Sequence, residues 1–259
     1  MPGPLVAAVA VLGLLVGSFL NVVIWRVPRK VSVAWPASHC PACEAPIQPL
    51  DNVPVASWLR LRGKCRQCDA PIPLRYPLVE VGCAVLFSAA ALRFGVSWAL
   101  PGYLVLFAAL LAISVIDLEH YIVPDRITVP LTLASIPLVG LASLGEGEGR
   151  AFVRSLLGAV AFFSFFFFLN LVYPKGMGMG DVKLSFSLGM YLGWVSWGEL
   201  FLGGFLAFLL GAVISVTLMA VRRRGGKDFV PFGPFLAAGT VIAVLWGEPV
   251  LRWYWGTTL

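Results

Sequence analysis

Long apolar segments fill most of this chain, and short polar stretches separate them. Eight segments approach the length of about 20 residues that a membrane-spanning helix needs. They are Pro4–Trp25, Pro77–Leu92, Trp98–Ile116, Ile127–Leu144, Ala151–Tyr173, Val182–Trp197, Leu200–Val221 and Phe235–Trp255. The segments show no alternation of the kind found in β-barrel strands. The pattern therefore predicts an all-α polytopic membrane protein with about eight transmembrane helices.

The sixth segment is short. Val182–Trp197 has 16 residues, which make a helix of about 24 Å, whereas the hydrocarbon core of a bilayer is about 30 Å thick. Such a helix tilts little, thins the bilayer or begins inside the membrane. In the last case, Asp181, which precedes the segment, is drawn toward the membrane interior.

Composition and charge support a membrane protein and give it an orientation. Of 259 residues, 59% are hydrophobic and 12% are charged, against about 25% charged residues in soluble domains. No Lys or Arg precedes the first segment, which we interpret as a span rather than a cleaved secretory signal. If the N-terminus lies outside, 15 of the 19 basic residues fall in segments on the cytoplasmic side, as the positive-inside rule requires. These are Arg26, Arg29, Lys30, Arg60, Arg62, Lys64, Arg66, Arg75, Arg126, Lys175, Lys183, Arg222, Arg223, Arg224 and Lys227.

One long polar insertion interrupts the apolar pattern and carries two Cys-x-x-Cys pairs. Cys40 and Cys43 are followed, after 21 residues, by Cys65 and Cys68. This spacing is typical of a tetrahedral zinc site; the alternative is two disulfides, which a reducing cytoplasm disfavours. Four thiolates leave no open coordination position, so the predicted zinc is structural. We accordingly divide the chain into a first transmembrane helix (1–25), a cytoplasmic zinc domain (26–76) and a transmembrane core (77–259).

Other features of the insertion suggest no further chemistry. Arg60, Arg62, Lys64 and Arg66 predict a solvated basic face near anionic lipids. Aromatic residues are too sparse there for a platform on which bases stack, so we expect no nucleic-acid partner. The fifth cysteine, Cys83, lies within an apolar segment and is expected to pack in the core.

The chain Gly176–Lys183 places a carboxylate, Asp181, at the edge of an apolar segment. An acid at that position is costly and by default marks a functional site; the alternative is an N-cap of the following helix. The glycines before it permit positive φ, so that the backbone can bend, and they permit close approach of another chain.

A second acidic group lies between the third and fourth segments. Asp117 directly follows an apolar run and is therefore the best partner for Asp181. We interpret Asp125 as a helix start, and Glu119 and His120 as solvated loop residues. Two neighbouring carboxylates share a proton, and together they activate water and protonate a leaving group, which is peptide hydrolysis without a metal. Glu80, inside the second segment, either snorkels to the interface or lines the site; the sequence leaves this open.

Six stretches, in the same order, resemble those of the prepilin peptidases, the leader peptidases of type IV pilin and type II secretion systems. The resemblance covers nearly the whole chain. The stretches are Gly17–Arg26, the paired Cys-x-x-Cys motifs, Tyr76–Glu80, Ile116–Asp125, the Gly-x-Gly-Asp stretch Gly178–Lys183, and Pro231–Phe235.

The resemblance implies an aspartic peptidase of the Gly-x-Gly-Asp type in a bacterial cytoplasmic (inner) membrane. Asp117 and Asp181 match the catalytic pair, and we assign Gly178, Gly180 and Lys183 to its support. The expected partners are prepilin or pseudopilin precursors, whose short basic leader is removed at the cytoplasmic face, and the lipid bilayer. The resemblance alone implies methylation of the new N-terminus with S-adenosylmethionine. No glycine-rich turn of a Rossmann unit marks a place for that cofactor.

Three alternatives remain open at the level of the sequence. The first is a peptidase without methyltransferase activity. The second is a Gly-x-Gly-Asp protease that cuts within transmembrane helices, although the zinc insertion and Pro231–Phe235 favour a leader peptidase. The third is a transporter or a zinc-stabilised scaffold in which Asp117 and Asp181 serve as proton or ion sites.

Overall fold

The computed structural model describes residues 3–174, 176–222 and 230–255. The chain divides into two compact units, Met1–Val96 and Ser97–Leu259. Four basic residues used in the orientation argument lie outside the described ranges, as does the side chain of Arg222; they are Lys175, Arg223, Arg224 and Lys227.

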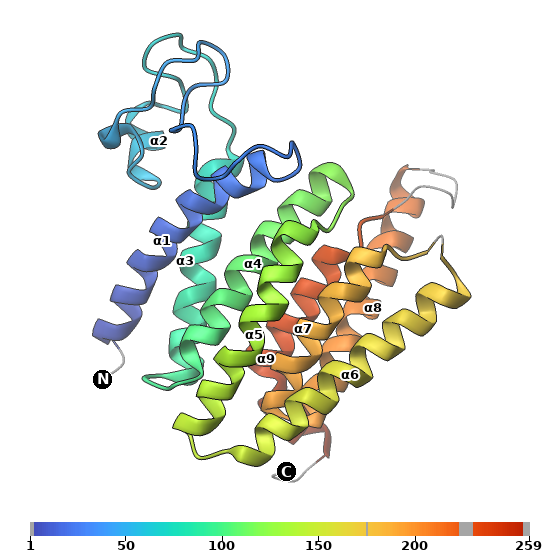
Figure 1. Ribbon diagram of the computed structural model, residues 1–259. Helices are drawn as coiled ribbons and strands as arrows, with labels where there is room; N and C mark the ends of the chain where they lie inside the picture. Colours follow the sequence, from blue (N-terminus) through green and yellow to red (C-terminus); the bar gives the residue numbers. More distant parts are fainter. Residues whose placement is uncertain (1–2, 175, 223–229, 256–259) are drawn as a thin grey trace. The chain divides into compact units, whose positions relative to one another are not determined.

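The first unit consists of two long helices and the polar insertion between them. Helices α1 (Gly3–Arg26) and α3 (Arg75–Phe94) lie side by side (Figure 1), and the insertion holds the short helices η1 (Pro49–Asp51) and α2 (Ala56–Arg60). A side chain at Gly13 or Gly17 would come within 2.6 Å of the Cα atom of Ala84 or Glu80. Glycines four positions apart therefore let the two helix backbones touch.

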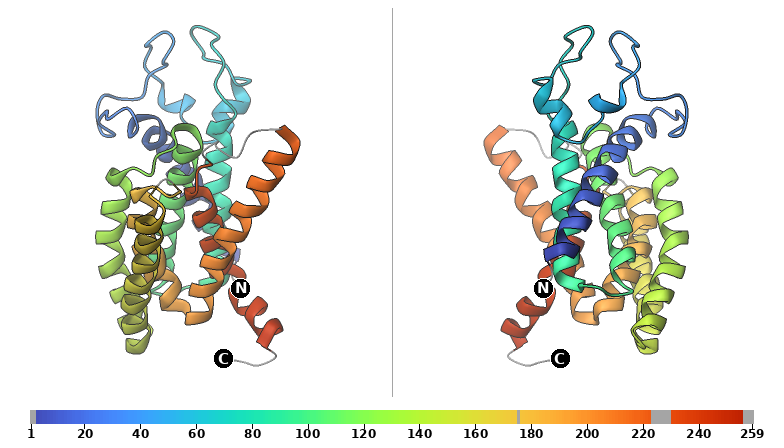
Figure 2. Two further views of the ribbon diagram at one scale, coloured as in Figure 1. Left: turned by 90° about the vertical axis from the view of Figure 1, so that its right-hand side faces the viewer. Right: turned by 90° about the vertical axis from the view of Figure 1, so that its left-hand side faces the viewer.

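The second unit is a bundle of six helices in which α7 is the most enclosed. The helices are α4 (Leu100–His120), α5 (Asp125–Gly145), α6 (Gly149–Val172), α7 (Met179–Val195), α8 (Trp197–Arg222) and α9 (Gly233–Trp255). Eleven of the 17 residues of α7 are buried. Helices α6 and α7 run side by side in Figures 1 and 2, and a Cβ at Gly158 or Gly189 would lie 2.7 or 2.5 Å from the carbonyl oxygen of the other. Small residues thus place α7 in the interior of the bundle.

The short helix α7 ends against a basic side chain of α6. Arg154 donates hydrogen bonds to the carbonyl oxygens of Gly193 (2.6 Å), Trp194 and Val195 (2.8 Å). The last carbonyls of a helix lack partners within it and carry partial negative charge. A guanidinium group therefore satisfies the end of α7 before α8 begins.

These helices confirm the predicted fold class. Each of the eight apolar segments is one long helix, and the described residues contain no β-strand, only isolated bridges. Within the described part of the chain, seven helices are long and apolar enough to cross a membrane, namely α1, α3, α4, α5, α6, α8 and α9. The eighth, α7, is the segment that the sequence identified as short. The protein is a multi-pass membrane protein.

Candidate functional site

Two buried carboxylates come from different helices of the second unit. Asp117 lies in α4, one turn before that helix ends, and is 3% exposed; Asp181 is the third residue of α7 and is 5% exposed. The two carboxylates are close enough for the charge of Asp117 to act on Asp181. The structure therefore brings together the two aspartates that the sequence paired.

Asp117 is held by the start of the last helix. The backbone amide of Gly233, the first residue of α9, donates a hydrogen bond to Oδ2 of Asp117 at 3.0 Å. A Cβ atom at position 233 would lie 2.8 Å from the same oxygen. Only glycine lets the backbone come this near, so the Pro231–Phe235 stretch supplies a hydrogen-bond donor rather than a side chain.

Asp181 presents one oxygen without a partner. Its Oδ1 atom is buried and has no hydrogen-bond partner among the described residues. The other side of the carboxylate interacts with the amide of Gly178, which is the N-cap residue of α7. Asp181 therefore is not the N-cap, although it reaches back to the helix start as acids in a first turn do. Its free oxygen is an acceptor for a water molecule or a proton.

The loop between α4 and α5 completes this site. A Cβ atom at Gly180 would lie 2.7 Å from Cβ and 2.8 Å from the carbonyl oxygen of Val123, and one at Gly233 would lie 3.4 Å from Cγ2 of Val123. Val123 is thus in contact with the starts of both α7 and α9. The sequence did not single out Val123, because an apolar loop residue next to a proline carries no chemical signal.

Two roles were predicted for the glycines before Asp181, a bend with positive φ and close approach of another segment, and only the second is observed. Among the described glycines, only Gly63, Gly95 and Gly147 have positive φ, and Gly178 has φ −75° and ψ 148°, which any residue adopts. The bend therefore does not depend on glycine conformation. Close approach is real at Gly180, where the backbone meets Val123.

The residues flanking Asp117 are helical, contrary to the loop that we predicted for them. Helix α4 continues through Glu119 to His120 and ends at Tyr121, whose amide donates to the carbonyl oxygen of Asp117. Glu119 is exposed, so its exposure was predicted correctly. His120 is only partly exposed. The helix extends past Asp117 because Leu118 and Glu119 are both good helix formers.

Asp125 and Lys183 form an ion pair that joins α5 to α7. Nζ of Lys183 lies 2.8 Å from both carboxylate oxygens of Asp125, and both side chains are partly exposed. Asp125 is the first residue of α5, as predicted, but the N-cap position belongs to Pro124 and no side-chain cap bond is formed. Lys183 thus contacts the residue next to the Val123 loop rather than either buried aspartate.

The four cysteines of the insertion form a compact cluster. The Sγ atoms of Cys40, Cys43, Cys65 and Cys68 all lie within 4.8 Å of one another, and those of Cys40 and Cys68 are 3.8 Å apart. A tetrahedral site with Zn–S bonds of about 2.3 Å has sulfur atoms about 3.8 Å apart. Backbone amides of Ala42 and Cys43 lower the pKa of the Cys40 thiol to about 6, which favours the thiolate that a metal needs. The cluster can hold a metal ion.

The cluster is built from the same loop twice. In each loop the backbone amide of the first cysteine donates to the carbonyl oxygen of the alanine five residues later. The backbone amide of the acid four residues later, Glu44 or Asp69, donates to the carbonyl oxygen of that cysteine, and both acids have positive φ. Figure 2 shows the two loops beyond the ends of α1 and α3. The repeat is visible in the sequence as Cys-x-x-Cys-acid-Ala-Pro-Ile at 40–47 and 65–72, a signal that the spacing argument passed over.

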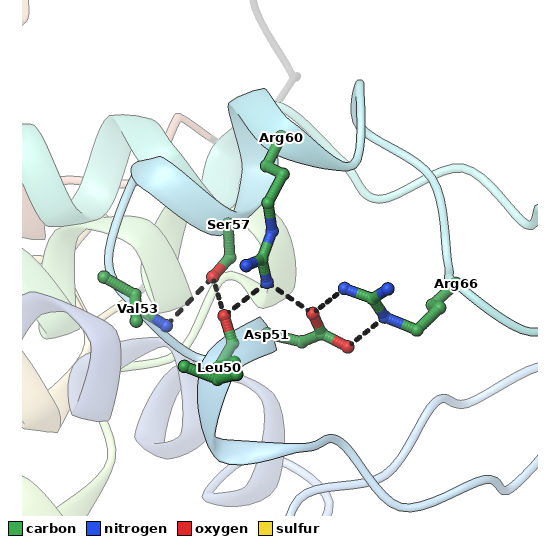
Figure 3. Close-up of polar contacts among 6 residues, drawn as sticks. All are labelled: Leu50, Asp51, Val53, Ser57, Arg60 and Arg66. Atoms are coloured by element: carbon green, nitrogen blue, oxygen red, sulfur yellow. Dashed lines mark hydrogen bonds and ion pairs between the residues drawn. The ribbon is translucent and has the colours of Figure 1, made fainter.

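The four basic residues of the insertion are exposed, as predicted, and two of them also form ion pairs. Asp51 accepts hydrogen bonds from Arg60 (2.7 Å) and from Nε and Nη2 of Arg66 (2.8 and 2.6 Å), while Arg60 also reaches the carbonyl oxygen of Leu50 (Figure 3). The hydrogen bond from Arg66 lowers the pKa of Asp51. Two of the four predicted surface cations therefore tie η1 to α2 and to the second cysteine loop.

Glu80 and Cys83 face the interior of the first unit. Cys83 is fully buried in α3, as predicted. Oε2 of Glu80 accepts the amide of Val55 at 2.7 Å. Glu80 therefore neither snorkels to the membrane interface nor lines the aspartate site. Its carboxylate anchors the insertion to α3.

Comparisons with known proteins agree with this architecture. The model of the bacterial peptidase A24 N-terminal domain matches residues 11–94, and that of the type IV leader peptidase family matches residues 104–216. No solved structure matches the chain.

Curated proteins match over nearly the full length. A prepilin leader peptidase/N-methyltransferase of Aeromonas hydrophila is 37% identical, over 93% of this chain and 90% of its own. Proteins of the same description from Stutzerimonas stutzeri and Pseudomonas aeruginosa are each 36% identical, over 98% of this chain and 94% of their own. Identity at this level over both units leaves one conclusion: the chain belongs to the type IV leader peptidase family.

Proposed function

We propose that Asp117 and Asp181 are the catalytic pair with which this leader peptidase hydrolyses its substrate. The observation that carries the proposal is the meeting of two buried, interacting carboxylates, one of which has an unpaired oxygen. Two such groups share a proton because both cannot ionise cheaply. One then accepts a proton from the attacking water, and the other donates a proton to the carbonyl oxygen or the leaving amine.

The surrounding residues orient this pair in our proposal. The amide of Gly233 fixes the Asp117 carboxylate, and Oδ1 of Asp181 is left to accept from water. Gly178 and Gly180 form the start of α7, where Gly180 admits the Val123 loop. Lys183 supports the same loop through Asp125. We assign the supporting residues no proton transfer.

The substrates that we infer are prepilin or pseudopilin precursors, cut after a short basic leader at the cytoplasmic face of a bacterial inner membrane. Support comes from the names of the relatives and from the match of both family models. This proposal includes the division into a first helix (1–25), a metal-binding insertion (26–76) and a peptidase core (77–259). All residues of the carboxylate site lie in the last of these segments.

The same relatives support a second activity, N-methylation of the new N-terminus. S-adenosylmethionine would supply an electrophilic methyl group for the free amine. The relatives are named both as peptidases and as methyltransferases, which favours a bifunctional enzyme over a peptidase alone. Their match across both units favours this enzyme over a transporter, a scaffold or a protease that cuts within membrane helices. We also propose zinc as the metal of the four cysteines, with a purely structural task, because no coordination position remains open.

The test of the catalytic pair is a cleavage assay with a purified precursor in detergent. Asp117→Asn and Asp181→Asn should each abolish cleavage, because Asn keeps the shape but cannot exchange the proton. The double variant should lose no more than either single variant, since the pair works as a unit. Asp125→Asn is the matched control: its side chain is exposed and paired with Lys183, so cleavage should change only a few-fold.

Two results would contradict this assignment. Substantial cleavage by the Asp181→Asn protein would return Asp181 to a role at the helix start. Loss of cleavage in Asp125→Asn together with an active Asp117→Asn protein would show that Asp125 is the true partner. Adding S-adenosylmethionine to the same assay tests the methylation separately, since only a bifunctional enzyme increases the mass of the mature product by one methyl group.

A further inference from the structure

The first unit contains a partly open cavity of about 450 Å³. The cavity is lined by the end of α1, the start of α3, and the loops and both short helices of the insertion. Every lining residue belongs to Ser18–Glu80. The volume lies within the range of about 300–1,000 Å³ that small-molecule sites occupy. Nothing in the proposed hydrolysis uses these residues.

A buried acceptor in the lining lacks a partner. Asn21 is 3% exposed, and its Nδ2 donates to the carbonyl oxygens of Gly17 (3.3 Å) and Tyr76 (3.1 Å). Both contacts are to acceptors, so they fix which end of the amide is nitrogen. Oδ1 then has no hydrogen-bond partner among the described residues. A buried acceptor without a partner is unfavourable, and an N–H group of a ligand would satisfy it.

A buried acid, Glu80, lies in the lining of the same cavity. Glu80 is 7% exposed, and it interacts with the amide of Val55 and the hydroxyl of Ser18, which are both neutral. The two arginines of the lining are engaged elsewhere: Arg26 donates to the carbonyl oxygens of Ser32 and Pro36, and Arg66 is paired with Asp51. The lining thus offers an acid without a cationic partner and no unengaged arginine, which suits a cationic ligand better than a nucleotide phosphate.

Aromatic rings complete the lining. Trp58 is held by a hydrogen bond from Nε1 to the carbonyl oxygen of Ile72 at 3.1 Å, and Trp25 and Tyr76 also line the cavity. Aromatic faces stack on planar heterocycles and attract onium groups. A ligand that unites a heterocycle, an ammonium group and a positive charge matches this set of groups.

We propose that this cavity is the binding site for S-adenosylmethionine, with Glu80 balancing its positive charge, Asn21 accepting one of its N–H groups and the aromatic residues receiving its adenine. The inference rests on the proposed methylation and adds a place and residues to it. The residues present fit the ligand through an orphaned acceptor, an acid with neutral partners and aromatic walls.

Binding to the purified full-length protein in detergent, measured by calorimetry with S-adenosylmethionine, tests the site without any turnover. Glu80→Gln keeps the size and the acceptor for Val55 and removes only the charge, so it should weaken binding at least tenfold. Glu44→Gln is the matched control: it makes the same change on an exposed residue of the same insertion that does not line the cavity, and it should bind like the wild type. Metal content and leader cleavage of each variant report its fold.

Photo-crosslinking with radiolabelled S-adenosylmethionine gives a second answer that does not depend on a variant. Label should map to peptides within residues 18–80 and be competed by S-adenosylhomocysteine. Label confined to residues 97–259, or normal binding by Glu80→Gln, would overturn the site while leaving the methyltransferase in place. A wild-type protein that neither binds the cofactor nor methylates a cleaved substrate would overturn both.

Discussion

Gly233 and Asp117 are joined by a hydrogen bond of 3.0 Å, although 116 positions separate them in the chain. The donor is a backbone amide, so only substitution by proline can remove it. What a substitution can change is the distance, because a Cβ at position 233 would lie only 2.8 Å from the carboxylate oxygen. The geometry of the carboxylate pair therefore depends on having glycine, which has no side chain, at position 233 in α9.

Gly233→Ala should reduce leader cleavage about 10- to 100-fold, because the added methyl group displaces Asp117 by a fraction of an ångström, and misplacements near 1 Å cost about 100-fold. The measurement is cleavage of a purified precursor. Gly140→Ala, whose Cβ would make an ordinary contact of 3.7 Å with Phe152, is the control and should retain activity. Equal activity of both variants would show that the contact with Gly233 is unimportant.

The two glycines of the Gly-x-Gly-Asp stretch should differ. Gly180→Ala drives a methyl group to 2.7 Å from Cβ of Val123, whereas Gly178→Ala meets Oδ2 of Asp181 at an ordinary 3.5 Å in a backbone conformation open to alanine. We expect Gly180→Ala to lose at least tenfold in cleavage and Gly178→Ala to lose only a few-fold. The reverse order in the same assay would mean that flexibility at Gly178, not contact at Gly180, is what the motif provides.

Arg154→Gln should destabilise the second unit. Glutamine is shorter and neutral and cannot replace three charged hydrogen bonds to the end of α7, each worth about 1.5–3 kcal/mol. We expect a thermal midpoint in detergent that is several degrees lower. Arg150→Gln, on the same helix but exposed, is the matched control. If both variants have the same thermal midpoint as the wild type, the hydrogen bonds from Arg154 contribute nothing measurable to stability.

Purified protein should contain about one zinc per chain, and Cys40→Ser with Cys43→Ser should lose it. Cys83→Ala should keep the metal, because Cys83 packs inside α3. Elemental analysis decides the stoichiometry. Cleavage should fall in the metal-free variant through unfolding of the insertion, so fully active protein without metal would contradict a structural role.

The proposed orientation predicts which thiols an impermeant maleimide reaches in intact cells whose outer membrane has been permeabilised. The native cysteines should not react, whereas a cysteine introduced at Glu146 should react. A cysteine at Arg60 should become reactive only after lysis. Reaction at position 60 in intact cells would invert the topology and place the carboxylate site on the other face.

Most of the fold follows from one-dimensional patterns. Apolar length predicted every long helix, and the short sixth segment became α7, whose early start draws Asp181 into its first turn. Spacing predicted the cysteine cluster, since two Cys-x-x-Cys pairs bring four thiols together in few ways. Local signals therefore sufficed wherever a single segment determines its own structure.

The missing parts are contacts between segments. Val123 and the amide of Gly233 carry no chemical signature, yet both shape the carboxylate site. Arg154 of α6 binds the carbonyls of another helix, a contact that no local pattern indicates. Arg60 and Arg66 are exposed as predicted, but nothing in the sequence indicated that both pair with Asp51. Such pairings depend on the packing of distant elements, which no local pattern records.

The order of the helices also has a consequence for biosynthesis. Asp117 and Asp181 are both synthesised before α9, but the amide that fixes Asp117 is supplied by the first residue of that final helix. A nascent chain that has inserted only α1 to α8 therefore holds both acids without the donor that orients one of them. If the two acids are the catalytic pair that we propose, the pair is fully oriented only after α9 has been synthesised and packed.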